Sequence, residues 1–272
     1  MTTPLVSIIT VTYNAEKYLE QTIKSVTTQS YKNIEYIIID GQSTDGTAAI
    51  IQRYRKHIAY YLSEPDNGIY DAMNKGIRKA AGELIGIINA SDFYQPDAVA
   101  HIVRAWIDHP QYGIFYGNTN FYFDNGCFLK EKKAAPNMDN LYKGIYFCHA
   151  SVFVTKATYQ KHGLFDLRYK LSGDFDFALR NYKAGTQFFY IDKVIANFRT
   201  GGISAQNNTN STQECYQSLI ANGYPEPVAQ AIRRRWIRKA QYNTMKQQLY
   251  KWKVGRWIIV FLCGVKQIAR NL

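Results

Sequence analysis

Residues 6–12 read VSIITVT, an uncharged run that is rich in β-branched side chains. Such side chains favour strands, and an apolar run without polar alternation is typical of a strand buried on both faces of a parallel sheet. Tyr13 and Asn14 follow it directly, so the run ends abruptly in polar residues. This stretch predicts the first central strand of an α/β domain.

Strand-like and helix-like segments alternate after this run as far as residue 108. The helical segments place apolar residues on one face, as Ile69, Met73 and Ile77 show for residues 69–80. Such alternation predicts a doubly wound, mostly parallel sheet flanked by helices. We expect strands at residues 35–40, 58–63 and 84–88, and helices at 18–29, from the turn at 41–47 to 55, at 69–80 and at 96–108.

The pattern changes after Tyr112, where short pieces rich in Tyr and Phe surround a predicted loop at 124–147. We expect strands at 151–154, 187–190 and 194–198, a helix at 174–184, a loop at 201–212 and a mainly helical remainder. The chain is therefore predicted to form an α/β domain over residues 1–212 and a helical, basic extension over residues 213–272.

The charge of the chain is concentrated near its C-terminus. The 272 residues have a net charge of +12, and residues 226–272 hold 11 Lys and Arg against one acid, Glu226. The body is close to neutral, so an anion-binding surface is expected on the extension. Four cysteines show no metal-binding spacing, and the N-terminus has no features of a signal peptide. A reducing, cytoplasmic location is the simplest expectation.

Polar side chains stand directly after three of the predicted strands. They are Tyr13 with Asn14, Asp40, and the segment Asn89-Ala90-Ser91-Asp92. Ligands of open α/β sheets bind beyond the carboxyl ends of the strands. One carboxylate there could accept hydrogen bonds from a nucleotide, and a second could hold Mg²⁺ or Mn²⁺ against a diphosphate. The alternative is that Asp40 and Asp92 are helix caps or turn formers.

Four segments in order resemble the family 2 glycosyltransferases of the GT-A fold. They are PLVSIITVTYNAEKYLEQTIKSV, IIIDGQSTDGT, SEPDNGIYDAMNKGIRKAAGELIGIINASD and LSGDFDFALR, which together span about residues 4–200. The third segment is especially similar to enzymes that build bacterial O-antigen and capsule repeat units. The resemblance implies a GT-A fold and transfer of a hexose from a UDP-sugar to a saccharide hydroxyl, on an acceptor linked to a polyprenyl diphosphate.

The resemblance also assigns the nucleotide-sugar site. It implies that the backbone of Val11 and the side chain of Tyr13 hold uracil and ribose, and that Asp40 hydrogen-bonds the base. It further implies that Asn67 and Asn74 shape the nucleotide pocket.

The metal-binding motif of the family falls on residues 89–92, where Asp92 would coordinate Mn²⁺ or Mg²⁺ and the diphosphate. Many relatives have a second acid where this chain has Ser91. A hydroxyl is a weaker ligand than a carboxylate, so a basic residue is expected to share the diphosphate charge.

In LSGDFDFALR, Asp174 aligns with the general base of the family, and many relatives have an acid at the position of Gly173. One carboxylate suffices for a single displacement, so the resemblance implies inversion and a β-linkage from a UDP-α-sugar. The alternative is that Asp174 caps the helix that follows. His149, in CHASVF, matches a position near the acceptor or metal, or is a structural histidine.

The extension mixes Trp, Tyr and basic residues, and its longest apolar run is Trp257 to Val265. Crossing a bilayer takes roughly 20 residues, so this segment is expected to lie on an anionic membrane surface. That placement predicts a peripheral protein at the inner face of the cell membrane. The alternative is packing on the domain or on another subunit.

Three other functions are compatible with parts of the sequence. A sugar nucleotidyltransferase shares the sheet and metal, but TYNAEKY after the first strand lacks the glycines of a triphosphate loop. A nucleic-acid-binding protein would suit the net charge, but the near-neutral body argues against nucleic acid as a partner. A non-catalytic relative would suit Ser91, but Asp40, Asp92 and Asp174 argue for an enzyme.

Overall fold

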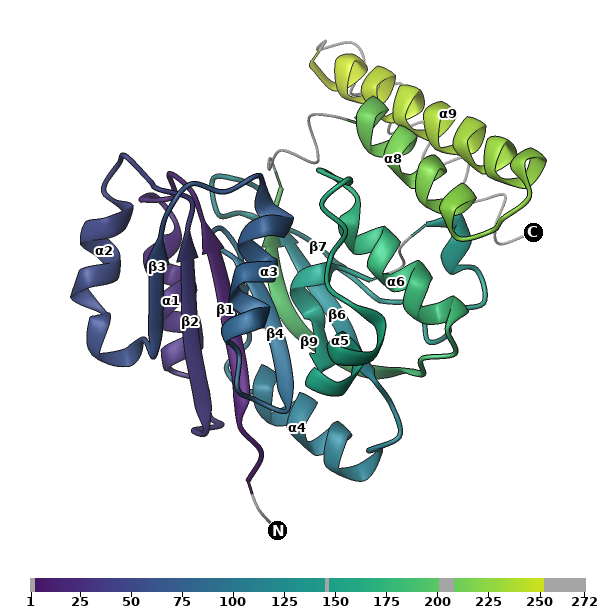
Figure 1. The fold of residues 1–272 in the computed structure, drawn as a ribbon. Coiled ribbons are helices and arrows are strands. Elements are labelled where there is room, and N and C mark those ends of the chain that lie inside the picture. The colour runs from purple at the N-terminus through teal and green to yellow at the C-terminus, as the bar shows by residue number, and fades with distance from the viewer. Residues whose placement is uncertain (1–2, 145–146, 201–207, 252–272) are drawn as a thin grey trace, which may run out of the picture.

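A mixed nine-stranded β-sheet lies at the centre of the computed structural model, which describes residues 3–144, 147–200 and 208–251 (Figure 1). Its strand order is β3-β2-β1-β4-β8-β6-β9-β5, and β7 pairs with β6. Helices cover both faces of the sheet, so the predicted α/β architecture is confirmed.

Four parallel strands form the N-terminal part of the sheet, and their carboxyl ends are in register. Thr12 pairs with Asp40, and Val11 pairs with Asn89. The polar residues that follow the strands therefore gather at one edge, as the sequence predicted. These strands are β1 (Val6–Thr12), β2 (Ile34–Asp40), β3 (Tyr60–Ser63) and β4 (Leu84–Asn89).

The other strands make the sheet mixed, because β6 and β9 pair in parallel whereas the pairings of β5, β7 and β8 are antiparallel. These strands are β5 (Phe93–Tyr94), β6 (Ile114–Tyr122), β7 (Phe128–Lys132), β8 (Val152–Thr155) and β9 (Phe188–Arg199). The prediction of two strands at 187–198 is wrong, because β9 is continuous and shifts register against β6 around Asp192 and Lys193. These two charged residues are exposed and interrupt the apolar pattern. The loop predicted at 124–147 contains β7.

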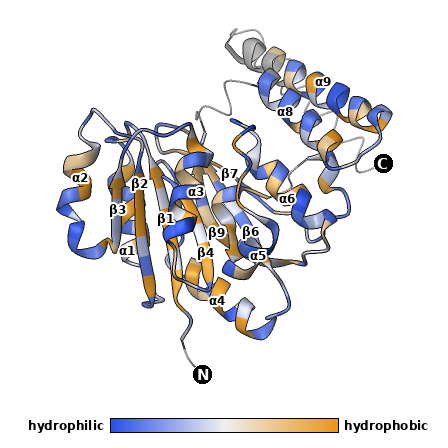
Figure 2. Cartoon of the chain, in the orientation of Figure 1, coloured by the Kyte–Doolittle hydropathy of each residue, from blue (hydrophilic) through white to orange (hydrophobic). Residues whose placement is uncertain are grey.

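Side chains alternate between two cores along the central strands. Ile8 of β1 packs in one core and Ile9 in the other, as the two-residue repeat of a strand requires. In Figure 2 the strands are largely hydrophobic, whereas the helices carry hydrophilic residues on their outer faces. One core lies under α1 (Leu19–Thr27), α2 (Thr47–Arg53) and α4 (Ala98–Asp108), and the other under α3 (Ile69–Lys79), α5 (Lys156–His162) and α6 (Gly173–Lys183). Single 3₁₀ turns are η1 (Arg55–His57), η2 (Leu141–Lys143) and η3 (His149–Ser151).

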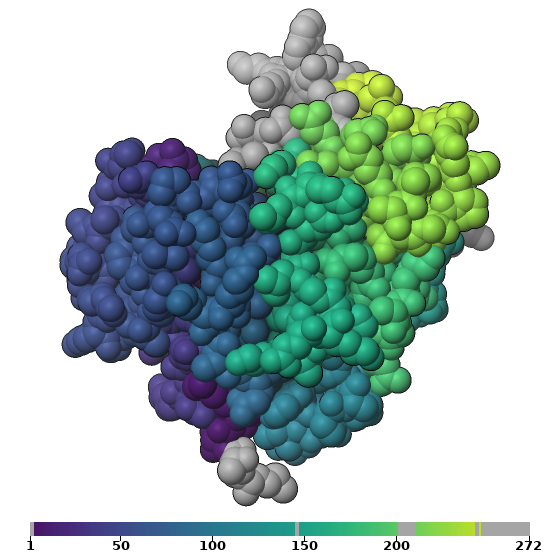
Figure 3. Space-filling model, in the orientation of Figure 1, coloured from purple at the N-terminus to yellow at the C-terminus, as the bar shows by residue number. Residues whose placement is uncertain are grey.

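Two C-terminal helices, α8 (Asn208–Ala221) and α9 (Glu226–Lys251), pack against each other and onto α6 (Figures 1 and 3). A separate apolar cluster joins them: Phe175, Leu179, Leu219, Ala229 and Ile232. The loop predicted up to residue 212 is wrong from residue 208 onward, because α8 begins there and crosses the proposed boundary at 212.

As far as Trp236, whose ring packs on Phe175, this packing agrees with the alternative in which the extension lies on the domain. The segment from Trp257 to Val265 lies outside the described residues. Among the helices that the structure describes, none combines the length and apolar character needed to cross a bilayer.

Candidate functional site

A cavity of about 1070 Å³ opens at the carboxyl edge of the parallel strands. The ends of β1 and β4 form its floor, α3 and the first turn of α6 form one wall, and β6, β7 and β9 contribute a second. Helices α8 and α9 also contribute residues to its lining. The cavity thus lies where the sheet topology and the sequence both predicted a ligand.

An aromatic ring and a carboxylate lie at one end of the cavity. Tyr13 follows β1 and is 64% exposed, and Asp66 follows β3. Gly41, which follows β2, lies against both: a Cβ atom there would stand 2.6 Å from Asp66 Oδ2 and 3.4 Å from the Tyr13 ring. Glycine at position 41 therefore allows the Asp66 carboxylate to approach the end of β2.

Asp40 does not line this cavity. Its side chain is fully buried, and it accepts hydrogen bonds from the Ser43 and Ser63 hydroxyls and from the Ser43 backbone N–H, at 3.1 Å for the last. Both carboxylate oxygens are used in holding the turn after β2 against β3. This arrangement favours the turn-forming interpretation of Asp40, and Asp66 is the acid that faces the cavity at this end.

The two asparagines predicted at the site lie behind the cavity wall. Asn74 on α3 exchanges two hydrogen bonds with the backbone of Phe165, at 2.8 and 3.0 Å. The Phe165 ring lines the cavity, so Asn74 shapes it indirectly. Asn67 uses its backbone N–H to bond Asp71 at 3.0 Å, and its carbonyl accepts from Lys170 at 2.8 Å.

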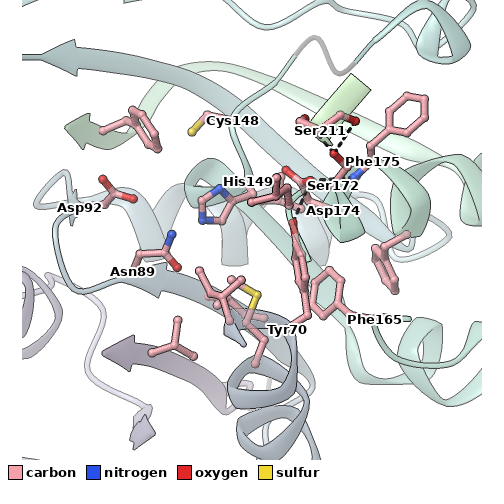
Figure 4. A pocket seen from close by; sticks show the side chains of 18 of the residues that line it. Tyr70, Asn89, Asp92, Cys148, His149, Phe165, Ser172, Asp174, Phe175 and Ser211 are labelled. Atoms are coloured by element: carbon pink, nitrogen blue, oxygen red, sulfur yellow. Dashed lines mark hydrogen bonds between the residues drawn. The ribbon is translucent and has the colours of Figure 1, made fainter. Parts of the chain in front are cut away.

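Five cavity-lining residues have a buried polar atom without a hydrogen-bond partner among the described residues. Two of these atoms are Thr12 Oγ1 and Arg199 Nε, and the other three form the group considered next. They are Asn89 Oδ1, Asp92 Oδ2 and His149 Nε2, and all three side chains line the cavity (Figure 4). The turn that carries Asn89 and Asp92 is fixed from α1, because the Thr22 hydroxyl lies 2.6 Å from the Asp92 carbonyl oxygen. Unpartnered buried polar atoms are rare in folded proteins, so this group is suited to a ligand.

Burial controls the charge of this group. It raises the pKa of Asp92 to about 7, against the opposing effects of the Arg199 backbone N–H, which donates to Oδ1 at 3.1 Å, and of the Arg199 guanidinium. Burial lowers the pKa of His149, although the charge of Asp174 acts in the other direction. A neutral imidazole with Nε2 unpartnered can act as a ligand.

The donor set fits a divalent cation. A carboxylate oxygen, an amide oxygen and an imidazole nitrogen suit Mn²⁺, and a bound cation would supply the positive charge that a buried Asp92 carboxylate lacks. Within the described residues, no three His, Cys, Asp or Glu side chains form a metal-binding group by themselves. Asn89 and a substrate diphosphate would therefore have to complete the coordination. Ser91 also lines the cavity.

Asp174 faces the same space from the first turn of α6 (Figure 4). Its Oδ1 accepts from the Tyr70 hydroxyl at 3.2 Å and from the Phe175 backbone N–H at 2.9 Å. No described residue donates to Oδ2, which leaves that oxygen for a ligand. The cap position belongs to Ser172, so Asp174 is not the N-cap. Asp176 points away from the cavity and pairs with Arg180 at 2.8 Å.

The structure therefore brings together six of the nine predicted site residues: Val11, Tyr13, Ser91, Asp92, His149 and Asp174. It adds others that sequence reasoning missed, which are Asp66, Tyr70, Lys132, Arg199, Trp236 and Lys239. Asp66 could have been found because it follows a strand at the same edge. Nothing in the local sequence indicates that the residues of β7, β9 and α9 line the cavity, because tertiary packing brings them there.

A family model described as glycosyl transferase family 2 matches residues 7–187. An uncharacterized glycosyltransferase of Mycobacterium tuberculosis is 45% identical over 104 residues, which are 38% of this chain and 40% of that protein. The match therefore spans less than half of that relative. A PGL/p-HBAD biosynthesis glycosyltransferase of the same species is 29% identical over 270 residues, which cover 94% of this chain and 100% of that protein.

Solved structures share the fold at low sequence identity. TarS 1-349 of S. aureus, in complex with UDP-GlcNAc, has a TM-score of 0.64 and 17% identity, with 86% of this chain and 71% of that chain covered. The mannosyltransferase PcManGT of Pyrobaculum calidifontis, in complex with GDP-Man and Mn²⁺, has a TM-score of 0.63 and 17% identity. The match covers 93% of this chain and 82% of that chain.

Proposed function

The chain belongs to glycosyl transferase family 2, and from that premise we propose that it is an inverting hexosyltransferase. It takes the sugar from a UDP-sugar and joins it to a saccharide hydroxyl through a β-linkage. The observation that carries the proposal is the pair of acids, Asp92 and Asp174, that face one cavity from opposite sides, with His149 between them (Figure 4).

The nucleotide occupies the end of the cavity next to Tyr13 and Asp66. An aromatic ring there can stack on a base, and a carboxylate can accept from the base or the ribose. TarS was solved in complex with UDP and with UDP-GlcNAc, and PcManGT was solved in complex with GDP-Man. We take uracil as the base from the sequence resemblance, and GDP is the competing nucleotide in the test below.

The diphosphate is placed near Asp92. Asn89 and Asp92 would supply oxygen ligands to Mn²⁺ or Mg²⁺, and His149 would add a nitrogen ligand to Mn²⁺. When bound, the cation supplies positive charge to the diphosphate leaving group. PcManGT was solved with Mn²⁺, which supports a divalent cation here.

Asp174 acts as the general base. Its free Oδ2 takes the proton of the acceptor hydroxyl while that oxygen forms a bond to the anomeric carbon. The bond from this carbon to the diphosphate breaks, and UDP leaves with the electron pair. Attack from the side opposite to the leaving group inverts the anomeric centre, so a UDP-α-sugar gives a β-linkage. Tyr70 holds the base in place through its hydroxyl.

The acceptor that we propose is a saccharide on a polyprenyl diphosphate, in the synthesis of a bacterial surface polysaccharide such as O-antigen or capsule. The basic C-terminal segment would hold the enzyme at the anionic inner face of the cell membrane. Sedimentation of the full chain with vesicles tests this placement. Binding to phosphatidylglycerol vesicles but not to phosphatidylcholine vesicles is expected, and equal binding to both or to neither contradicts it.

Ligand-induced stabilisation tests the donor class. The protein is heated with UDP, GDP, CMP or dTDP, each with Mn²⁺ and with EDTA, because a ligand that binds only the folded state raises the apparent Tm. We expect the largest rise with UDP, and a larger rise with Mn²⁺ than with EDTA. Release of UDP from UDP-sugars is then measured with saccharide acceptors. A larger response to GDP would overturn the UDP assignment, and no response to any nucleotide would overturn the enzyme itself.

A further inference from the structure

One face of α9 reaches the cavity in a fixed position. Ala229, Ile232 and Trp236 recur every three to four residues and pack toward α6. The Trp236 ring meets the Phe175 ring at 90°, with 5.7 Å between centroids, and its Nε1 donates to the Lys143 carbonyl oxygen at 2.8 Å. The next residue on this face is Lys239, which lines the cavity.

Lys132, the last residue of β7, lines the same cavity. It is half-buried, and burial lowers its pKa. Cys148 acts in the opposite direction, while the charges of Lys239 and Lys130 add to the lowering. Lys132 and Lys239 therefore present two like charges, from two separate elements, to the same cavity. Such convergence is unfavourable without an anion between the charges.

Neither ammonium group has a carboxylate within 4.0 Å among the residues that the structure describes. Lys75 on α3, by contrast, has Glu64 at 2.9 Å and Asp71 at 3.7 Å. Lys132 and Lys239 thus differ from a lysine in a structural ion pair: their charges are left for a ligand.

We propose that Lys132 and Lys239 form a subsite for a phosphate ester group. This inference rests on the proposed function, because that reaction brings phosphate from two sources. One is the diphosphate of the donor, and the other is the phosphate that joins the acceptor sugar to its carrier. A phosphate offers several oxygens to two ammonium groups that approach from different elements. The acids Asp92 and Asp174 line the same cavity, so the two ammonium groups also offset negative charge that would otherwise repel a phosphate.

Calorimetric titration with inorganic pyrophosphate tests the subsite. The full chain is compared with the pair variant, Lys132→Gln with Lys239→Gln. The matched control is Lys133→Gln with Arg238→Gln, which removes the same charge from the neighbouring, exposed residues. We expect the pair variant to bind pyrophosphate about tenfold more weakly, as the loss of charged hydrogen bonds implies. The control is expected to bind as the original protein does, and unchanged Tm values verify the fold of both.

A second titration in saturating UDP separates the two sources. Pyrophosphate binding that persists and still depends on the pair assigns the subsite to the acceptor phosphate. Competition with UDP, with weaker binding of UDP but not of uridine by the pair variant, assigns it to the donor diphosphate. Equal affinities in the pair variant and the control, or no pyrophosphate binding by the original protein, would overturn the subsite. A failure of UDP to bind would instead overturn the proposed function, while the comparison of pair and control remains valid.

Discussion

The hydroxyl of Tyr70 on α3 donates a hydrogen bond of 3.2 Å to Oδ1 of Asp174 on α6, across 104 residues of sequence. This bond links α3, which packs on the parallel part of the sheet, to the helix that carries the proposed base. The Tyr70 ring also packs on Phe165, with 5.3 Å between centroids, and it lies so close to Gly173 that a Cβ atom there would be 2.9 Å away. Tyr70 therefore fixes the direction in which the Asp174 carboxylate points.

Removal of this hydroxyl is expected to slow the reaction without weakening donor binding. Tyr70→Phe keeps the ring on Phe165 but leaves Asp174 free to rotate, so we predict a fall in kcat of about tenfold, the cost of one misplaced hydrogen bond. The KM for the UDP-sugar is expected to stay within about twofold, as the bond does not touch the donor. A rise in KM with an unchanged kcat would show that Tyr70 serves binding instead.

Replacement of the base itself is expected to have a larger effect. Asp174→Asn has nearly the same shape and can still accept from Tyr70, but an amide cannot take a proton. We predict that sugar transfer falls by roughly 10²–10⁴-fold, the usual contribution of a general base. The affinity for UDP, measured by calorimetry, is expected to remain near the original value. Transfer at the original rate would remove Asp174 from the mechanism.

The parallel part of the fold could be predicted from the sequence because its signals are local. The run 6–12, the acid at the end of β2 and the turn at 89–92 each follow from a few consecutive residues. The far wall of the cavity depends instead on long-range packing. Lys132 and Trp236 are 104 positions apart, and nothing near either residue indicates that both face the same space.

The roles of the acids were harder to predict than their positions. Asp40 ends β2 and Asp66 follows β3, at the same edge of the sheet. The surrounding hydroxyls distinguish them: Ser43 and Ser63 donate to Asp40, whereas Asp66 faces the cavity. Side-chain partners of this kind come from the next strand or turn, so they appear only once the sheet is assembled.

Loss of Asp176 is expected to destabilise the protein. Its side chain is 3% exposed and bonds Arg180 at 2.8 Å, while the Ser218 hydroxyl of α8 donates to its other oxygen at 2.9 Å. Removing one partner of a buried ion pair leaves the other uncompensated, so Asp176→Ala should lower the free energy of unfolding by about 3 kcal/mol. Urea denaturation measures this change.

The matched control for Asp176 is Asp166→Ala. Asp166 pairs with Arg168 at the surface, and such pairs contribute under about 1 kcal/mol. An equal decrease in the free energy of unfolding for both variants would contradict the prediction. It would mean that the contact of α6 with α8 through Asp176 does not stabilise the protein more than a surface ion pair does.

The buried carboxyl group of Asp92 should make the stability of the metal-free protein fall with rising pH. Its pKa is raised from 3.8 to about 7, so the folded state keeps a proton that the unfolded state has already lost. The unfolded state therefore binds fewer protons between pH 4 and 7, and the free energy of unfolding decreases over this window. A shift of this size corresponds to about 4 kcal/mol in total. Below pH 4 and above pH 7, Asp92 does not change the free energy of unfolding any further with pH.

Asp92→Asn isolates this effect, because an amide does not titrate. Urea denaturation in EDTA at pH 4, 5, 6, 7 and 8 should show the variant gaining stability relative to the original protein up to pH 7, with a constant difference above it. Mn²⁺ binds the ionised carboxylate, so at pH 8 it should raise the Tm of the original protein and leave that of Asp92→Asn nearly unchanged. Parallel stability curves for the two proteins would mean that Asp92 is ionised in the folded state throughout, whereas an equal response to Mn²⁺ would place the cation elsewhere.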